Sequence, residues 1–214
     1  MQHGLLVKLG DKRLSREELG QKVKADFSLL PIIVEGVSSP KATIRYGCGR
    51  ILMNLSGEHP GKLYPHMDFF VSLLDSKYRI LKWVALAVTA NLARVDSENR
   101  FDALLSKYYG FLDDEHMVTV ANVVGHSATI AQAKPHLVPR ITRELLKVER
   151  LKTTPHLTDE CKLVIAEKAI KSFDVFFDSV EDKKVVLAFV KRQLNKPRES
   201  LKVAAEAFLK KWDA

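Results

Sequence analysis

Four cations in the C-terminal half of the chain have the spacing of one helix face. They are Arg140, Arg143, Lys147 and Arg150. Side chains three and four positions apart lie on the same side of an α-helix, so the spacing predicts that all four project together. Guanidinium groups bind phosphates and carboxylates through paired hydrogen bonds, which makes this face a candidate binding site. Glu144 and Glu149 lie among the cations, and we favour the interpretation of a solvated face.

Two asparagines, Asn54 and Asn91, fall on the same position when the chain is compared with itself after a shift of 37 residues. An amide side chain donates and accepts hydrogen bonds at once, so it can hold the backbone of a bound peptide. Arg50 precedes Asn54 by one helical turn and is a candidate contact beside it. The alternative, which we favour, is that each amide bonds backbone groups of a neighbouring repeat.

The histidines give no pattern typical of a metal site. None of the seven has the spacing of metal ligands, which usually come in closely spaced pairs. His66, His136 and His156 each follow a proline near an expected helix start. We therefore expect no metal, no cofactor and no catalytic residue.

The elements that position these side chains are repeated helices. Residues 37–55 and 74–92 are similar in sequence, with Ile44 matching Leu81 and Tyr46 matching Trp83. A third, shorter copy begins at Leu194. Helical repeats of this length stack as helix pairs, because no single pair can bury its apolar face alone.

Caps and apolar spacing set the expected helix boundaries. Ser15 and Glu18 form a capping box that begins the first helix, and Pro40 marks the entry to the second. The expected helices cover residues 15–36, 41–56, 62–74, 76–94, 99–112, 115–132, 136–149, 159–177, 182–194 and 198–212, with no strand. The expected organisation is an N-terminal extension over residues 1–14 and one solenoid domain over residues 15–214.

Composition excludes several classes of protein. An apolar content of 46% and a charged content of 28% are typical of a folded globular chain. No apolar run reaches the length of about 20 residues that spans a bilayer. Cys48 and Cys161 lie inside helical patterns, and free buried thiols suit the reducing cytoplasm, which is the expected location. The net charge of +8 is uneven, because residues 134–214 hold 18 basic and 12 acidic side chains.

The repeated segments resemble the HEAT repeat. That repeat pairs an A helix, often with an early proline, to a B helix that opens with an acidic turn and an apolar-cation step. The matching segments are 63–65 and 137–139 in A helices, 74–75 and 112–113 at turns, and 44–45, 81–82 and 201–202 in B helices. The resemblance covers residues 15–214. It implies an all-α, right-handed α-α superhelix of about five antiparallel helix pairs.

The resemblance suggests a role for a recurring cation. Arg45, Lys82 and Lys202 occupy one position of the repeat. They could form a ladder of cations along a groove. In HEAT-like arrays, however, this side chain pairs with the acidic turn residue or with the last carbonyls of a neighbouring helix. We favour this structural role.

More distant resemblances bear on function. Armadillo repeats hold an extended peptide with a ladder of asparagines, and Asn54 and Asn91 look like that motif. The tryptophan three positions earlier in that family is absent, since Ile51 and Val88 stand there. HEAT-like alkylpurine DNA glycosylases carry an aspartate one turn after a tryptophan, but Ala87 follows Trp83. The missing carboxylate disfavours an enzyme.

The sequence therefore predicts a non-catalytic scaffold that binds another macromolecule, most readily a protein. The alternative is a nucleic-acid binder that uses the basic C-terminal third, with or without glycosylase activity. No membrane partner is expected.

Overall fold

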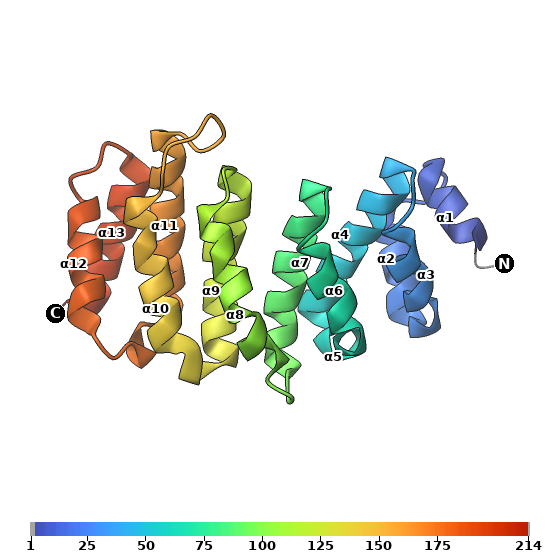
Figure 1. The fold of residues 1–214 in the computed structure, drawn as a ribbon, viewed down its shortest axis with the longest axis horizontal. Coiled ribbons are helices and arrows are strands. Elements are labelled where there is room, and N and C mark those ends of the chain that lie inside the picture. Colours follow the sequence, from blue (N-terminus) through green and yellow to red (C-terminus); the bar gives the residue numbers. More distant parts are fainter. Residues whose placement is uncertain (1–2, 214) are drawn as a thin grey trace. The chain divides into compact units, whose positions relative to one another are not determined.

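The computed structural model describes residues 3–213, and over that range the chain consists of helices joined by turns and loops (Figure 1). It forms two compact units, with the boundary between Asp96 and Ser97. Each unit is described by itself. The predicted division into an extension over 1–14 and a domain over 15–214 stays a prediction. None of the described helices combines the length and the apolarity that crossing a membrane requires.

Unit 1 is built around two long helices. Its α-helices are α1 (His3–Gly10), α2 (Arg16–Ala25), α3 (Leu30–Gly36), α4 (Ala42–Glu58), α5 (Pro60–Leu63), α6 (Met67–Leu73) and α7 (Arg79–Leu92), with 3-10 turns at Phe27–Leu29, Tyr64–His66 and Ala93–Val95. Helix α4 packs against α1, α2, α3 and α7, and α6 packs against α7. The core of the unit therefore lies around α4 and α7, where Leu52, Leu55 and Leu86 are fully buried.

The first helix of the sequence prediction is wrong in its extent. The predicted capping box at Ser15 is present, since its Oγ accepts from the Glu18 amide at 3.1 Å. The helix ends at Ala25, however, because the Asp26 carboxylate accepts from the Ser28 amide at 3.0 Å and bends the chain. A new helix then begins beside Pro31. Residues 3–10, for which no helix was predicted, form α1.

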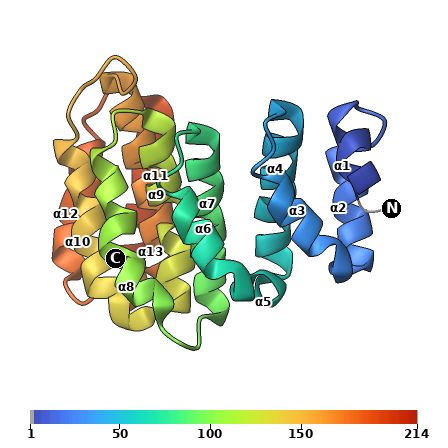
Figure 2. The same ribbon diagram turned by 45° about the vertical axis from the view of Figure 1, so that its right-hand side comes forward.

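Unit 2 consists of successive helix pairs. Its α-helices are α8 (Arg100–Gly110), α9 (Met117–Ala133), α10 (Val138–Leu146), α11 (Asp159–Phe176), α12 (Lys183–Gln193) and α13 (Glu199–Trp212), with 3-10 turns at Phe111–Asp113, Pro135–Leu137, Lys147–Arg150 and Phe177–Ser179. Helices α8, α10 and α12 form one layer, and α9, α11 and α13 form the other (Figure 2). Phe173, Phe177 and Phe189 are among the largest buried side chains.

The connection between α10 and α11 is longer than the others in unit 2 and folds against the start of α9. The Met117 amide donates to the His156 carbonyl at 3.0 Å. The Thr154 hydroxyl donates to the Glu115 carbonyl at 2.5 Å. A single bridge between Thr154 and Leu157 closes the loop, and no strand occurs within the described range 3–213. The predicted all-α fold is confirmed.

Candidate functional site

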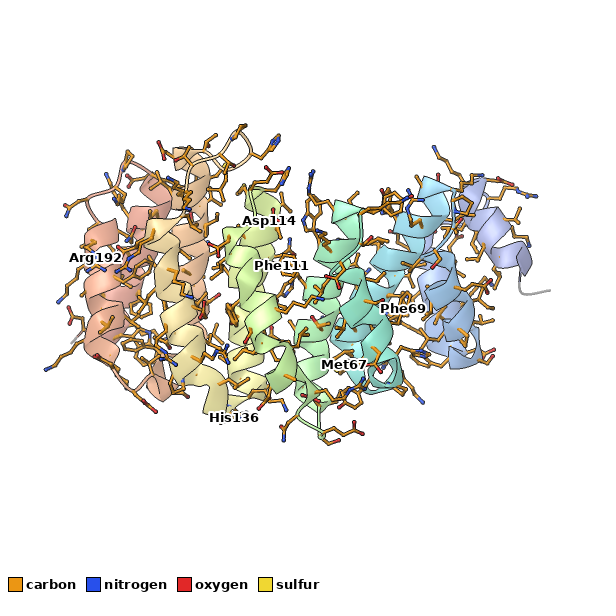
Figure 3. The ribbon with its side chains drawn as sticks, in the orientation of Figure 1. Met67, Phe69, Phe111, Asp114, His136 and Arg192 are labelled. Atoms are coloured by element: carbon orange, nitrogen blue, oxygen red, sulfur yellow. The ribbon has the colours of Figure 1, made fainter. Side chains whose placement is uncertain are left out.

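A cleft of about 610 Å³ opens in unit 2 where α8, α10 and the long connection meet the start of α9. Figure 3 shows Asp114, one of its lining residues, at the end of the unit where α9 begins. The lining residues are Ser106, Tyr109, Gly110, Leu112, Asp113, Asp114, Glu115, Arg140, Glu144, Lys147, Arg150, Leu151, Lys152, Thr154 and Leu157. We call this cavity the cleft.

The floor of the cleft is apolar. Leu112 and Leu157 are buried, and Tyr109 is only 4% exposed. The Tyr109 hydroxyl donates to Ser127 Oγ at 2.9 Å. Burial raises the pKa of Tyr109 above its usual range, although the bond to Ser127 partly opposes the shift. This phenol therefore stays protonated and acts as packing rather than as an acid or a base.

One wall of the cleft is basic, and α10 with the following turn supplies most of it. Arg140 donates to Ser106 Oγ at 2.6 Å, and Lys147 pairs with Glu144 at 2.5 Å. Arg150 is exposed, and no ion pair joins it to another residue in the described part of the chain. The wall thus contains cations already engaged within the unit and at least one that is available to a ligand.

The four predicted cations do not share one surface. Helix α10 ends at Leu146, so Lys147 and Arg150 belong to a 3-10 turn and do not continue the α-helical spacing. Arg140, Lys147 and Arg150 line the cleft. Arg143 lines a different cavity, on the side of α12. The expectation of one common face is therefore wrong for Arg143, while Lys152 joins the cleft from the long connection.

The opposite wall is acidic and was not recognised in the sequence as part of a site. It is formed by Asp113, Asp114 and Glu115. Asp114 Oδ1 accepts from the His116 amide at 2.8 Å, and His116 Nδ1 lies 3.4 Å from that carboxylate and 3.5 Å from Glu115. The signal was the run of three acidic residues, of which only Asp113 was interpreted, as part of a helix turn.

A pair of stacked imidazoles lies beside the acidic wall. The rings of His116 and His156 are 4.4 Å apart between centroids and tilted by 11°. His156 belongs to the long connection, so the stack adds to the bonds that hold this connection at the start of α9.

The cleft combines charged and apolar lining residues. In the described part of the chain, no group of three or more histidine, cysteine, aspartate or glutamate side chains is placed to hold a metal ion. The hydroxyl of Tyr109 is buried and bonded, and the charged side chains line the cleft together with Leu112, Leu151 and Leu157. Such a cavity recognises a ligand by shape and charge.

The predicted contacts in unit 1 lie in a smaller hollow. Arg50 and Asn54 are exposed and line a cavity of about 120 Å³ between α2 and α4. Its rim also carries an ion pair of 2.5 Å between Lys24 and Glu58. Arg50 and Asn54 thus lie on the side of α4 that borders α2.

Asn91 has a different environment from Asn54. Its Nδ2 donates to Ser56 Oγ on α4 at 2.9 Å, and Ser56 in turn donates to the Met53 carbonyl at 2.7 Å. The amide of Asn91 therefore joins neighbouring helices within unit 1, through a hydroxyl rather than through a backbone group. Asn54 and Asn91 do not present two equivalent amides to a ligand.

The recurring cations are also placed differently. Arg45 is only 6% exposed and donates to the carbonyls of Ser39 and Pro40 at 2.8 and 3.1 Å. Its guanidinium lies 3.9 Å above the ring of Tyr78. Lys202 approaches Glu199 at 3.8 Å, and Lys82 is half-buried. At least for Arg45, these contacts favour the structural role over a ladder of free cations.

No protein-family profile and no curated protein sequence matches the chain. Among solved structures, it is similar to the designed armadillo repeat protein YIII(Dq)4CqI, with 18% identity, a TM-score of 0.64 and coverage of 96% of this chain and 89% of that chain. It is also similar to the designed armadillo repeat protein YIII(Dq.V1)4CPAF in complex with peptide (KR)4, with 18% identity, a TM-score of 0.68 and coverage of 97% and 91%.

The chain folds as a helical-repeat α-solenoid. This confirms the predicted fold class, and the solved structures to which it is similar are of the armadillo type. At this level of identity the likeness concerns the fold alone.

Proposed function

We propose that this α-solenoid is a non-catalytic binding protein that holds a segment of another protein in the cleft of unit 2. The proposal depends on one observation, a cavity of about 610 Å³ whose lining combines apolar residues with cations and carboxylates. Ligand cavities of about 300–1,000 Å³ typically combine an apolar lining with a few placed polar groups. One of the similar designed proteins was solved with a peptide, and we extend that class of ligand to this chain.

The basic wall indicates which partner groups would bind there. Arg150 and Lys152 are exposed and line the cleft, and a guanidinium binds a carboxylate through paired hydrogen bonds. An acidic side chain of the partner would therefore contact this wall while apolar side chains cover the floor at Leu112 and Leu157. In unit 1, Arg50 and Asn54 remain proposed contacts.

No observation favours nucleic acid as the ligand. Asp113, Asp114 and Glu115 line the same cleft as the cations, and their carboxylates would repel a phosphate backbone. The glycosylase alternative has no support either, because no carboxylate occurs one turn after Trp83, where Ala87 is fully packed.

The proposal is tested by affinity capture of partners with the full chain, with and without nuclease. We expect proteins that remain bound after nuclease treatment and are lost when Arg150→Glu and Lys152→Glu are combined. The matched control combines Lys184→Glu and Lys210→Glu, which makes the same change in net charge at exposed positions outside the cleft. Capture that nuclease abolishes, or equal loss in both variants, would contradict the proposal.

A further inference from the structure

A second cavity of unit 2 lies on the other side of α10 and shares no lining residue with the cleft. It has a volume of about 470 Å³ and lies between α10 and the entry to α12. Arg143 and Leu146 line its α10 side, and Val180 and Val185 line the other. We call this cavity the furrow. Of the four cations that the spacing placed on one helix face, Arg143 is the one that lines the furrow instead of the cleft.

The furrow exposes apolar surface. Val180 is buried at its base, Leu146 is half-buried, and Val185 is 43% exposed. Burying apolar surface stabilises a complex by about 25 cal/mol for each Å² removed from water. An apolar side chain of a partner that covered Leu146 and Val185 would therefore bind with a favourable contribution.

The charges that border the furrow are unpaired within the described chain. Arg143 lines the furrow from α10, and Glu181 and Asp182 line it from the segment before α12. All three are exposed, and no ion pair or side-chain hydrogen bond joins any of them to another residue between 3 and 213. Carboxylates at the start of α12 also interact favourably with the helix dipole. That interaction leaves their oxygen atoms open to a second, cationic group.

Neighbouring charges on the same segments are paired, in contrast to those of the furrow. Lys147 pairs with Glu144 at 2.5 Å, and Arg192 on α12 contacts Glu149 at 2.7 Å. Among the residues that line the furrow, the two unpaired carboxylates outnumber the single cation, which makes the lining complementary to a positively charged ligand.

We infer that the furrow is a docking site for a segment of a partner protein in which an apolar side chain is followed by basic ones. The apolar side chain would cover Leu146 and Val185, and the basic side chains would reach Glu181 and Asp182. Arg143 would donate to a backbone carbonyl of the segment. The furrow and the cleft would therefore select different sequences, and this inference does not depend on the proposed function.

The test uses the full, isotope-labelled chain and the synthetic peptide Gly-Ser-Leu-Lys-Arg-Ser-Gly, with NMR as the readout. We expect saturable shift changes of the amides of Arg143 and residues 180–185. Peptides with Leu replaced by Ser, or Lys-Arg by Glu-Glu, should bind at least about tenfold more weakly, because each lacks one of the two complementary contacts. Absence of shifts, shifts centred elsewhere, or equal binding of the Glu-Glu peptide would overturn the inference.

Variants of the furrow separate docking from general charge attraction. Combining Glu181→Lys and Asp182→Lys should weaken binding by about tenfold or more, whereas Glu98→Lys with Glu206→Lys, at exposed positions elsewhere in unit 2, should not. Val185→Ser should weaken peptide binding. Val203→Ser, at an exposed side chain of α13, should leave peptide binding unchanged. Equal loss in a variant and its control would overturn the inference. Arg150→Glu with Lys152→Glu, which changes the cleft, should leave the binding of this peptide to the furrow unchanged. A failure of the cleft proposal can therefore be told apart from a failure of the furrow inference.

Discussion

At the scale of single residues, Gly36 is the glycine of unit 1 at which an added Cβ would meet the closest contact. A Cβ at Gly36 would lie 2.5 Å from Cys48 Sγ and 3.1 Å from Leu6 Cδ2, closer than van der Waals contact allows. Cys48 is fully buried, so its sulfur has little room to move. We expect Gly36→Ala to destabilise the protein by about 1–3 kcal/mol, as overpacking of a core does, measured by urea unfolding.

Gly125 provides the matched control for this prediction. It lies inside α9, is exposed, and has no atom within 4 Å of a built Cβ. Alanine is favoured over glycine in a helix by about 1 kcal/mol, so Gly125→Ala should stabilise the protein. If Gly36→Ala were as stable as the parent, α3 could not approach α4 as closely as the structure shows.

The sequence predicted individual site residues only partly, for a reason that is visible at Arg143. Spacing placed Arg140, Arg143, Lys147 and Arg150 on one face, but spacing does not say which neighbouring element each side chain meets. Arg140 and Arg143 both lie in α10, yet Arg140 contacts Ser106 of α8 whereas Arg143 borders the entry to α12. The acidic residues opposite them depend on how the long connection folds, and local spacing holds no information about that contact.

At the scale of elements, the packing of α13 on α11 depends on Glu167. This carboxylate accepts from Lys171 and Ser200 at 2.6 Å each and from Arg198 at 3.4 Å. Burial alone would raise the pKa of Glu167, but these hydrogen bonds and the charge of Lys171 outweigh it and lower the pKa from 4.5 to about 2. The folded state therefore favours the ionised carboxylate.

The sign of the pH dependence follows from that lowered pKa. The stabilisation is fully present above pH 4.5 and is lost as the pH falls towards about 2, because the unfolded state binds the proton first. Glu167→Gln should flatten the fall in unfolding free energy over this range. Glu206→Gln, at an exposed position of α13, should not. Parallel pH profiles for the parent and Glu167→Gln would contradict this role.

Most helices could be predicted from the sequence because caps and apolar spacing are local signals. The helices after residue 40 begin and end close to the expected positions, as α4 and α9 show. The prediction failed at Asp26, where a side chain bonds the backbone and outcompetes the helix. It also failed for α1, whose short apolar run has no cap signal and whose partners lie in α3 and α4.

At the scale of the whole molecule, the net charge of +8 raises the question of nucleic-acid binding. Many of the cations are engaged within the protein, as in the pairs Lys171–Glu167 and Lys211–Asp174. A carboxylate beside each of these cations weakens its attraction for a phosphate backbone. The charge should thus attract DNA and RNA only weakly and without sequence preference.

The prediction is that oligonucleotide binding, measured by fluorescence anisotropy, is weak even at low salt and falls only gradually as the salt concentration rises. Each phosphate contact adds about 0.9 to the slope of log K against log salt for duplex DNA, so a few contacts give a shallow slope and low affinity. Arg143→Glu with Lys147→Glu should reduce binding no more than Lys184→Glu with Lys210→Glu, because neither pair forms a dedicated phosphate site. Sequence-selective, submicromolar binding at physiological salt would contradict this expectation, and release of bases from alkylated DNA would contradict the non-catalytic assignment as well.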